Sequence, residues 1–188
     1  MITIKKVETK KDLKKFIEFP NILYKDNPYY VPSLYSDEYN HLNLKKNPAH
    51  AYCDTIYYLA YDENNQIVGR VAGIINLAYN KDHNQLQARF NRIDFIDSFE
   101  VCKTLLDAIE DWAKEKGMEE VIGPIGFTDL DKQGLLVEGF EEMDMFITLY
   151  HFPYYKEHIE ACGYLKDVDW IEYELDLADI NVEYQEKL

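Results

Sequence analysis

Cysteine, signal-like segments and long apolar runs are scarce or missing in this chain. Its three cysteines lie far apart, are odd in number and lack the paired spacing of a metal site. This argues against a disulfide framework or a metal centre, and predicts small buried side chains at Cys53, Cys102 and Cys162, with a catalytic thiol as the alternative. No stretch has the length and apolarity of a membrane span, and the basic start MITIKKVETKK lacks the apolar run of a signal peptide. We therefore expect a cytoplasmic protein without membrane contact and without a metal.

Positive charge is in the minority, and it is unevenly spread. The chain has 20 Lys and Arg against 35 Asp and Glu, a formal net charge of −15. Residues 1–50 hold nine Lys against six acidic residues, so the remaining 138 residues hold 11 basic against 29 acidic residues. Such a field repels nucleic acid and anionic membranes. It favours a basic or polyamine-like acceptor, although solubility alone is the competing explanation.

The length of 188 residues suits one domain with a substantial core. We predict a single domain over residues 1–177 and a tail, or the start of a truncated connection, over residues 178–188. The chain opens with a short strand, ITIKKV, and then a helix that Thr9 and Asp12 cap and that Pro20 ends. A segment rich in Tyr, Pro and Asn follows, with a helix expected around residues 33–43.

The clearest local signal is a β-hairpin over residues 56–76. Two β-rich runs flank DENNQ, and Gly69 and Gly73 mark a bulge or a close approach of backbones. LAYNKDHNQLQARFN then reads as a polar connection into a strand at residues 90–96. Later segments predict a buried strand, EEVIG, a long loop from Phe127 to Tyr150, a helix, YYKEHIEACGY, and a last alternating strand, DWIEYELDL.

An unusual turn joins the strand at residues 90–96 to the next helix. Apolar residues recur at helical spacing from Val101 to Trp112, and Gly117 ends this amphipathic helix. A strand, a turn and a helix N-terminus in this order commonly bind phosphate, provided that glycines expose the backbone N–H groups. Here the turn from Asp97 to Glu100 contains no glycine, and Asp97 and Glu100 have the spacing of a capping box. A degenerate phosphate site and a self-capped helix without a ligand are therefore both open.

The order of elements and three local segments resemble the GNAT superfamily of acyl-CoA N-acyltransferases. These segments are LAYDENNQIVGRVAGII, IDFIDSFEVCKTLLDAIEDWAKEKGMEEVIG and YYKEHIEACGYLKDVDWIEYEL, which together span most of residues 56–175. The resemblance implies an α/β (α+β) fold with a central mixed, mostly antiparallel sheet flanked by helices. NPYYVPSL, VIGPIGFTD and LLVEGF are similar to an uncharacterised bacterial branch whose members tend to be about twice as long. That similarity implies that the chain corresponds to an N-terminal half.

The resemblance also implies where acetyl-CoA or another acyl-CoA would bind. In the superfamily a glycine-rich loop at the start of the central helix holds the pyrophosphate, and aligning on Leu105 and Leu106 puts that loop at residues 97–102, where every glycine is missing. The superfamily's frequent tyrosine acid, four residues before the closing helix's glycine, corresponds to Ile159. The cofactor-binding residues implied are Phe95, Ile96, Asp97, Ser98, Lys103 and Thr104.

Two functions follow as hypotheses. The first is an N-acetyltransferase for a small-molecule or basic amine, with a base among Asp94, Asp97 and Glu138 and an acid among Tyr154, Tyr155 and His158. The second is a non-catalytic binding or pairing module that has lost CoA and pairs with a second GNAT-like half or as a homodimer. Glycine loss favours the second hypothesis. The long segment GFTDLDKQGLLVEGFEEMDMF favours the first, because such a loop could close over a ligand.

Overall fold

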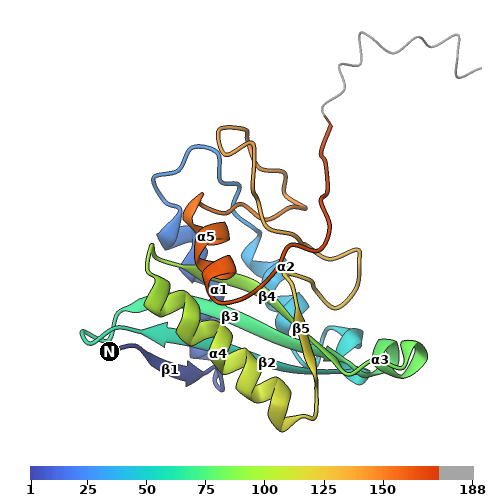
Figure 1. Ribbon diagram of the computed structural model, residues 1–188. Helices are drawn as coiled ribbons and strands as arrows, with labels where there is room; N and C mark the ends of the chain where they lie inside the picture. The colour runs from blue at the N-terminus through green and yellow to red at the C-terminus, as the bar shows by residue number, and fades with distance from the viewer. Residues whose placement is uncertain (174–188) are drawn as a thin grey trace, which may run out of the picture.

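The structure is a computed structural model that describes residues 1–173 (Figure 1). Five strands form one sheet in the order β1-β2-β3-β4-β5, in which all neighbours are antiparallel except the parallel pair β4 and β5. This is the mixed, mostly antiparallel sheet that the sequence predicts. Along the chain the elements are β1 (Thr3–Lys6), α1 (Lys10–Leu23), α2 (Tyr35–Leu42), the 3₁₀ helix η1 (Pro48–Ala51), β2 (Cys53–Tyr61), β3 (Ile67–Asn76), α3 (Leu77–His83), β4 (Gln87–Phe95), α4 (Phe99–Glu115), β5 (Glu120–Ile122) and α5 (Tyr154–Ala161).

Helices cover both faces of the sheet. On one face α4 packs across β2, β3 and β4 and buries its whole apolar side, as its amphipathic pattern predicts. On the other face α1 and α2 pack on alternate residues of β2 and on Ala72 of β3. Because successive residues of a strand point to opposite faces, the nearly continuous apolar run of β3 supplies both cores.

The predicted hairpin is confirmed as β2 and β3. Gly69 and Gly73 mark a close approach to α4, because a Cβ atom at either position would lie 2.8 Å from a side chain of that helix, Leu105 or Trp112. The register of β2 with β3 shifts between Ala60 and Tyr61, opposite Gly69, so the predicted bulge is also present.

A second irregularity, in β4, opens the sheet. The register of β3 with β4 shifts between Arg70 and Ala72, and Arg92 has a φ of 46°, in the left-handed region. Beyond this bulge the end of β4 stays paired with β3 but leaves β5, whose pairing is confined to residues 87–89 of β4. The strands therefore splay apart, and within residues 1–173 one edge of β4 around Phe95 has no sheet partner.

Pro20 does not end the first helix, contrary to the sequence prediction. α1 continues to Leu23 with Pro20 inside it. A proline has no N–H, so the carbonyl of Phe16, four residues earlier, loses its helical partner. Arg70 Nη1 donates to that carbonyl at 2.7 Å instead, and a tertiary hydrogen bond thereby replaces the missing helical one.

Three other predictions need correction. The polar connection after the hairpin contains α3, which Asn76 caps by accepting from Tyr79 N, and β4 begins at Gln87, earlier than expected. By contrast, the predicted long loop from Phe127 to Tyr150 is confirmed. The last predicted strand is absent from residues 169–173, and its remaining residues, with the domain boundary at residue 177, lie outside the described part of the chain.

Two expectations about burial and hydropathy can be compared with the structure. Cys53 and Cys102 are buried, as expected of small structural side chains, whereas Cys162 is only half-buried. Among the described residues, no helix combines the length and the apolarity that crossing a membrane requires.

Candidate functional site

The candidate site lies at the open end of β4. The free edge at Phe95, the N-terminus of α4, the first turn of α5 and the C-terminal end of α1 meet there. β4 delivers Asp94 and Phe95 to this place because the bulge at Arg92 turns its last residues away from β5.

A buried series of hydrogen bonds connects β3, β4, the residue after α1 and the first turn of α5. Arg70 Nε donates to Asp94 Oδ2 at 2.7 Å, and Tyr24 OH donates to Asp94 Oδ1 at 2.9 Å. Tyr24 OH lies 2.8 Å from Tyr155 OH, and the backbone N–H of Phe95 donates to Tyr155 OH at 3.0 Å. Two residues that the sequence suggests as base and acid, Asp94 and Tyr155, are therefore brought together through Tyr24.

Which group donates in each of these hydrogen bonds follows from the carboxylate of Asp94 at one end of the series. A carboxylate only accepts, so Tyr24 gives its proton to Asp94, and Tyr155 must then give its own proton to the oxygen of Tyr24. Burial, with the charge of Asp94 second, raises the pKa values of both tyrosines well above that of a free tyrosine. Both stay neutral at physiological pH, and the proton of Tyr155 points into the core.

α5 also occupies the free edge of β4. Tyr155 OH accepts from Phe95 N, and Tyr154 OH donates to Phe95 O at 2.7 Å. The ring of Tyr155 is fully buried, 4.3 Å from the ring of Phe95. Burial, followed by the charge of Asp97, raises the pKa of Tyr154. Both polar groups of the Phe95 backbone are therefore satisfied by the protein itself.

The cap of α4 differs from the predicted capping box. Ser98, not Asp97, is the N-cap, and its Oγ accepts from Val101 N at 3.4 Å. Asp97 instead reaches α5, where its Oδ1 lies 2.7 Å from His158 Nε2. Ser98 fits the cap because its side chain is short. Asp97 is left to contact His158 in the last turn of α5.

The other predicted site residues lie around this centre or away from it. Ile96 N donates to Val68 O within the sheet. Lys103 pairs with Asp107 on the exposed side of α4 at 2.7 Å, and Thr104 OH donates to the carbonyl of Glu100. Glu138 is exposed in the long loop. The turn before α4 therefore carries the carboxylates of Asp97 and Glu100, and Lys103 is directed away from them to Asp107.

Sequence reasoning missed Tyr24 and Arg70, the two residues that complete the buried series of hydrogen bonds. Arg70 had a visible signal, because it is a charged residue within the apolar run IVGRVAGII. A charge at such a position is normally paired, and Asp94 in the neighbouring strand is its partner. Tyr24 gave no comparable signal, since its role depends on how far α1 continues beyond Pro20.

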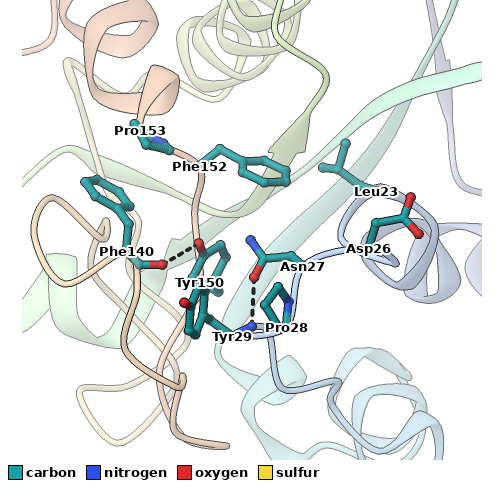
Figure 2. A pocket seen from close by; sticks show the side chains of 9 residues that line it. All are labelled: Leu23, Asp26, Asn27, Pro28, Tyr29, Phe140, Tyr150, Phe152 and Pro153. Atoms are coloured by element: carbon teal, nitrogen blue, oxygen red, sulfur yellow. Dashed lines mark hydrogen bonds between the residues drawn. The ribbon is translucent and has the colours of Figure 1, made fainter.

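An open groove lies beside the centre (Figure 2). Its volume is about 350 Å³, and aromatic and aliphatic side chains dominate its lining. The segment after α1 forms one wall and the long loop with the residues before α5 forms the other. The lining residues are Leu23, Asp26, Asn27, Pro28, Tyr29, Phe140, Tyr150, Phe152 and Pro153.

Tyr150 and Phe152 connect this groove to the buried series of hydrogen bonds. Their rings pack on the ring of Tyr24, with centroids 5.7 and 4.9 Å away. Tyr150 OH donates to Phe140 O at 2.9 Å, which fixes the outer wall of the groove (Figure 2). The rings of Tyr150 and Phe152 would therefore separate a molecule in the groove from Tyr24, whose hydroxyl is hydrogen-bonded to Tyr155.

Comparisons with known proteins agree with this geometry. No family model matches the chain. It is 34% identical to protein YghO of Escherichia coli over 173 residues, which is 91% of this chain and 43% of that protein. It is 30% identical to the bacterial ceramide synthase of Caulobacter vibrioides over 172 residues, which is 90% of this chain and 44% of that protein. The chain thus spans less than half the length of these curated relatives.

Solved acetyltransferases share the fold. A predicted acetyltransferase of Clostridium acetobutylicum, solved with acetyl-CoA, superposes with a TM-score of 0.52 at 16% identity, covering 96% of this chain and 99% of that one. At this identity the likeness concerns the fold alone. The chain therefore has the GNAT acetyltransferase fold, and its sequence is related to about half of YghO and of the bacterial ceramide synthase.

Proposed function

We propose that the chain is one GNAT-fold unit of a longer acyl-CoA-dependent N-acyltransferase, and that this unit does not itself hold CoA. The activity is suggested by the relative named a ceramide synthase, since a ceramide is the amide of a fatty acid and a long-chain amino alcohol. The relatives' greater length leaves room for a second unit that carries the acyl donor. This unit then pairs with that second unit and supports it.

The observation that carries the proposal is the occupied edge of β4. Acyl transfer needs hydrogen-bond donors aimed at the thioester oxygen. In a GNAT fold, the edge of β4 that β5 leaves unpaired could supply them. Here Phe95 N donates to Tyr155, and Phe95 O accepts from Tyr154. Since both tyrosines belong to the first turn of α5, an incoming thioester would have to displace that turn.

The residues at the start of α4 do not fit a pyrophosphate either. Asp97 is largely exposed there, and Glu100 lies in the first turn of the helix. A carboxylate about 4 Å from a phosphate costs on the order of 4 kcal/mol at an effective dielectric constant of about 20. Lys103 is directed to Asp107 and does not offset this cost.

Exposed apolar side chains support a pairing role. After α5 the chain carries five large apolar residues that are more than half exposed. β5 has only three residues and pairs with β4 alone among the described strands. Apolar surface of this kind commonly marks a protein interface. The five residues are Leu165, Val168, Trp170, Ile171 and Tyr173.

Thermal unfolding with and without millimolar acetyl-CoA at low salt tests the proposal. A ligand at about 100 times its Kd adds about 2.7 kcal/mol, which is a rise of roughly 5–10 °C for a domain of this size. We expect no rise for the wild-type chain. The double variant Asp97→Asn, Glu100→Gln separates charge from steric closure, because only charge exclusion would let it shift. A clear rise for the wild type would overturn the proposal.

A second candidate is that the chain itself is the acyltransferase, with Tyr155 as acid and Asp94 or Glu138 as base. The ordered chain from Phe95 N through Tyr155 and Tyr24 to Asp94 favours it, because these groups already lie in hydrogen-bond contact. It requires acetyl-CoA to bind the wild-type chain and Tyr155→Phe to slow acyl transfer to an amine. The same thermal measurement therefore decides between the two candidates.

A further inference from the structure

The groove of Figure 2 is of moderate size and is lined mainly by apolar side chains. Its volume of about 350 Å³ lies at the lower end of the range for small-molecule sites, which are mostly apolar with a few polar groups. Leu23 and Phe152 line one end, and Pro28, Tyr29 and Phe140 line the other. Because the hydroxyl of Tyr150 is hydrogen-bonded to Phe140 O, Tyr150 lines the groove with its aromatic ring.

The charge at the rim of the groove favours some head groups of an apolar ligand over others. Among the described residues that line the groove, Asp26 alone is charged. Its side chain is 88% exposed, and its carboxylate lies 3.7 Å from Lys25 Nζ. The chain as a whole carries a formal charge of −15. A fatty acid or a CoA ester would bring more negative charge to this rim, whereas an ammonium group would find a carboxylate.

We propose that the groove binds the hydrocarbon tail of a long-chain primary amine, whose ammonium group lies at Asp26. This inference rests on the proposed N-acyltransferase function and deepens it by naming the acceptor class and its place. It assigns the acceptor to this unit and leaves the acyl donor to the second unit. The groove passes Tyr150 and Phe152, so the tail lies against the aromatic shell of Tyr24.

Binding of simple amines to the isolated chain tests the assignment by calorimetry, below the micelle concentration of each probe. Butylamine, octylamine and dodecylamine vary the tail, and dodecanoate and dodecanol vary the head. We expect affinity to rise with tail length by roughly two- to fourfold for each buried methylene until the groove is full. We also expect dodecylamine to bind more tightly than dodecanol, and dodecanoate to bind most weakly.

Two variants, each with a matched control, locate the site. Asp26→Asn should weaken the binding of dodecylamine about two- to fivefold and leave the binding of dodecanol unchanged. The effect is modest because the carboxylate is exposed, so that solvent screens its ion pair with the ammonium group. Asp82→Asn, on exposed α3, should change neither. Phe140→Ala should weaken the binding of both probes. Phe146 lies in the same loop outside the groove and is 75% exposed, so Phe146→Ala should weaken the binding of neither probe.

The inference is overturned if affinity does not depend on tail length, if dodecanoate binds as tightly as dodecylamine, or if the groove variants behave as their controls. These outcomes are independent of acetyl-CoA. If the protein binds both dodecylamine and acetyl-CoA, the acceptor groove is supported and the proposal that CoA is held elsewhere is contradicted. If it binds neither ligand, only the acceptor groove is contradicted.

Discussion

The pair of Arg70 and Asp94 is buried on both sides, with each side chain less than a tenth exposed. Its guanidinium is shared between a carboxylate of β4 and the carbonyl that Pro20 leaves unpaired in α1, so one residue fixes a helix to the sheet. Buried pairs add little net stability compared with apolar substitutes, but removal of one partner leaves an uncompensated charge. The pair is therefore a sensitive test of the structure at the centre of the site.

We expect Arg70→Met to destabilise the protein by about 3–5 kcal/mol, because Asp94 would remain buried without its cation. The double variant Arg70→Met, Asp94→Leu should recover part of this loss. Urea unfolding followed by circular dichroism measures both. Lys103→Met, which breaks an exposed pair on α4, is the control and should change stability little. A loss for Arg70→Met as small as that of the control would contradict the buried pair.

At the scale of elements, α4 and α5 begin next to each other. Ser98 caps α4, and Asp97 bridges to His158 of α5 while Tyr154 and Tyr155 bond the end of β4. α5 has Pro153 before its first turn and no side-chain cap. Its position consequently depends on these contacts with β4 and α4 more than on its own eight residues.

The two adjacent residues at this helix start should respond differently to alanine. Ser98→Ala removes the acceptor of Val101 N and should cost about 1 kcal/mol. Asp97→Ala removes a contact whose carboxylate side is 68% exposed, and should cost less than about 1 kcal/mol. Urea unfolding of both variants checks the order. A larger loss for Asp97→Ala would restore the capping box that the sequence suggests.

At the scale of the whole molecule, acidity acts on stability through several buried groups. Burial lowers the pKa of His151 to about 4, from an ordinary value of 6.5. Burial also lowers the pKa values of His41 and His50. For Glu38, burial alone would raise the pKa, but the charge and hydrogen bonds of Arg92 lower it to about 2. Each group therefore binds protons more readily in the unfolded chain than in the folded one.

Stability should accordingly fall on acidification in two windows. The contribution of His151 is complete above pH 6.5 and is lost as the pH falls to about 4, and linkage limits it to about 3 kcal/mol. The contribution of Glu38 is complete above pH 4.5 and is lost as the pH falls towards 2. Urea unfolding from pH 8 to pH 2 covers both windows. His151→Gln should flatten the upper window, and an unchanged slope there would contradict a buried neutral imidazole.

The sequence by itself determined the elements whose signals are local. The hairpin of β2 and β3, the amphipathic helix α4 and the close approach at Gly69 and Gly73 follow from period, turn residues and glycine placement, and the structure confirms them. The resemblance to the GNAT superfamily added the mixed, mostly antiparallel sheet flanked by helices, which the structure confirms. The missing glycines before α4 already indicated a turn poorly suited to phosphate.

The tertiary structure alone decided what depends on partners far apart in sequence. Pro20 ends a helix by local rules, yet α1 continues because Arg70, 50 residues later, bonds the freed carbonyl of Phe16. Asp97 has the spacing of a cap, yet it pairs with His158 of α5. Tyr24 and Tyr155 are 131 residues apart and join in one hydrogen bond. Such contacts depend on the bulge and splay of β4, and short-range sequence patterns do not encode which distant groups that geometry brings together.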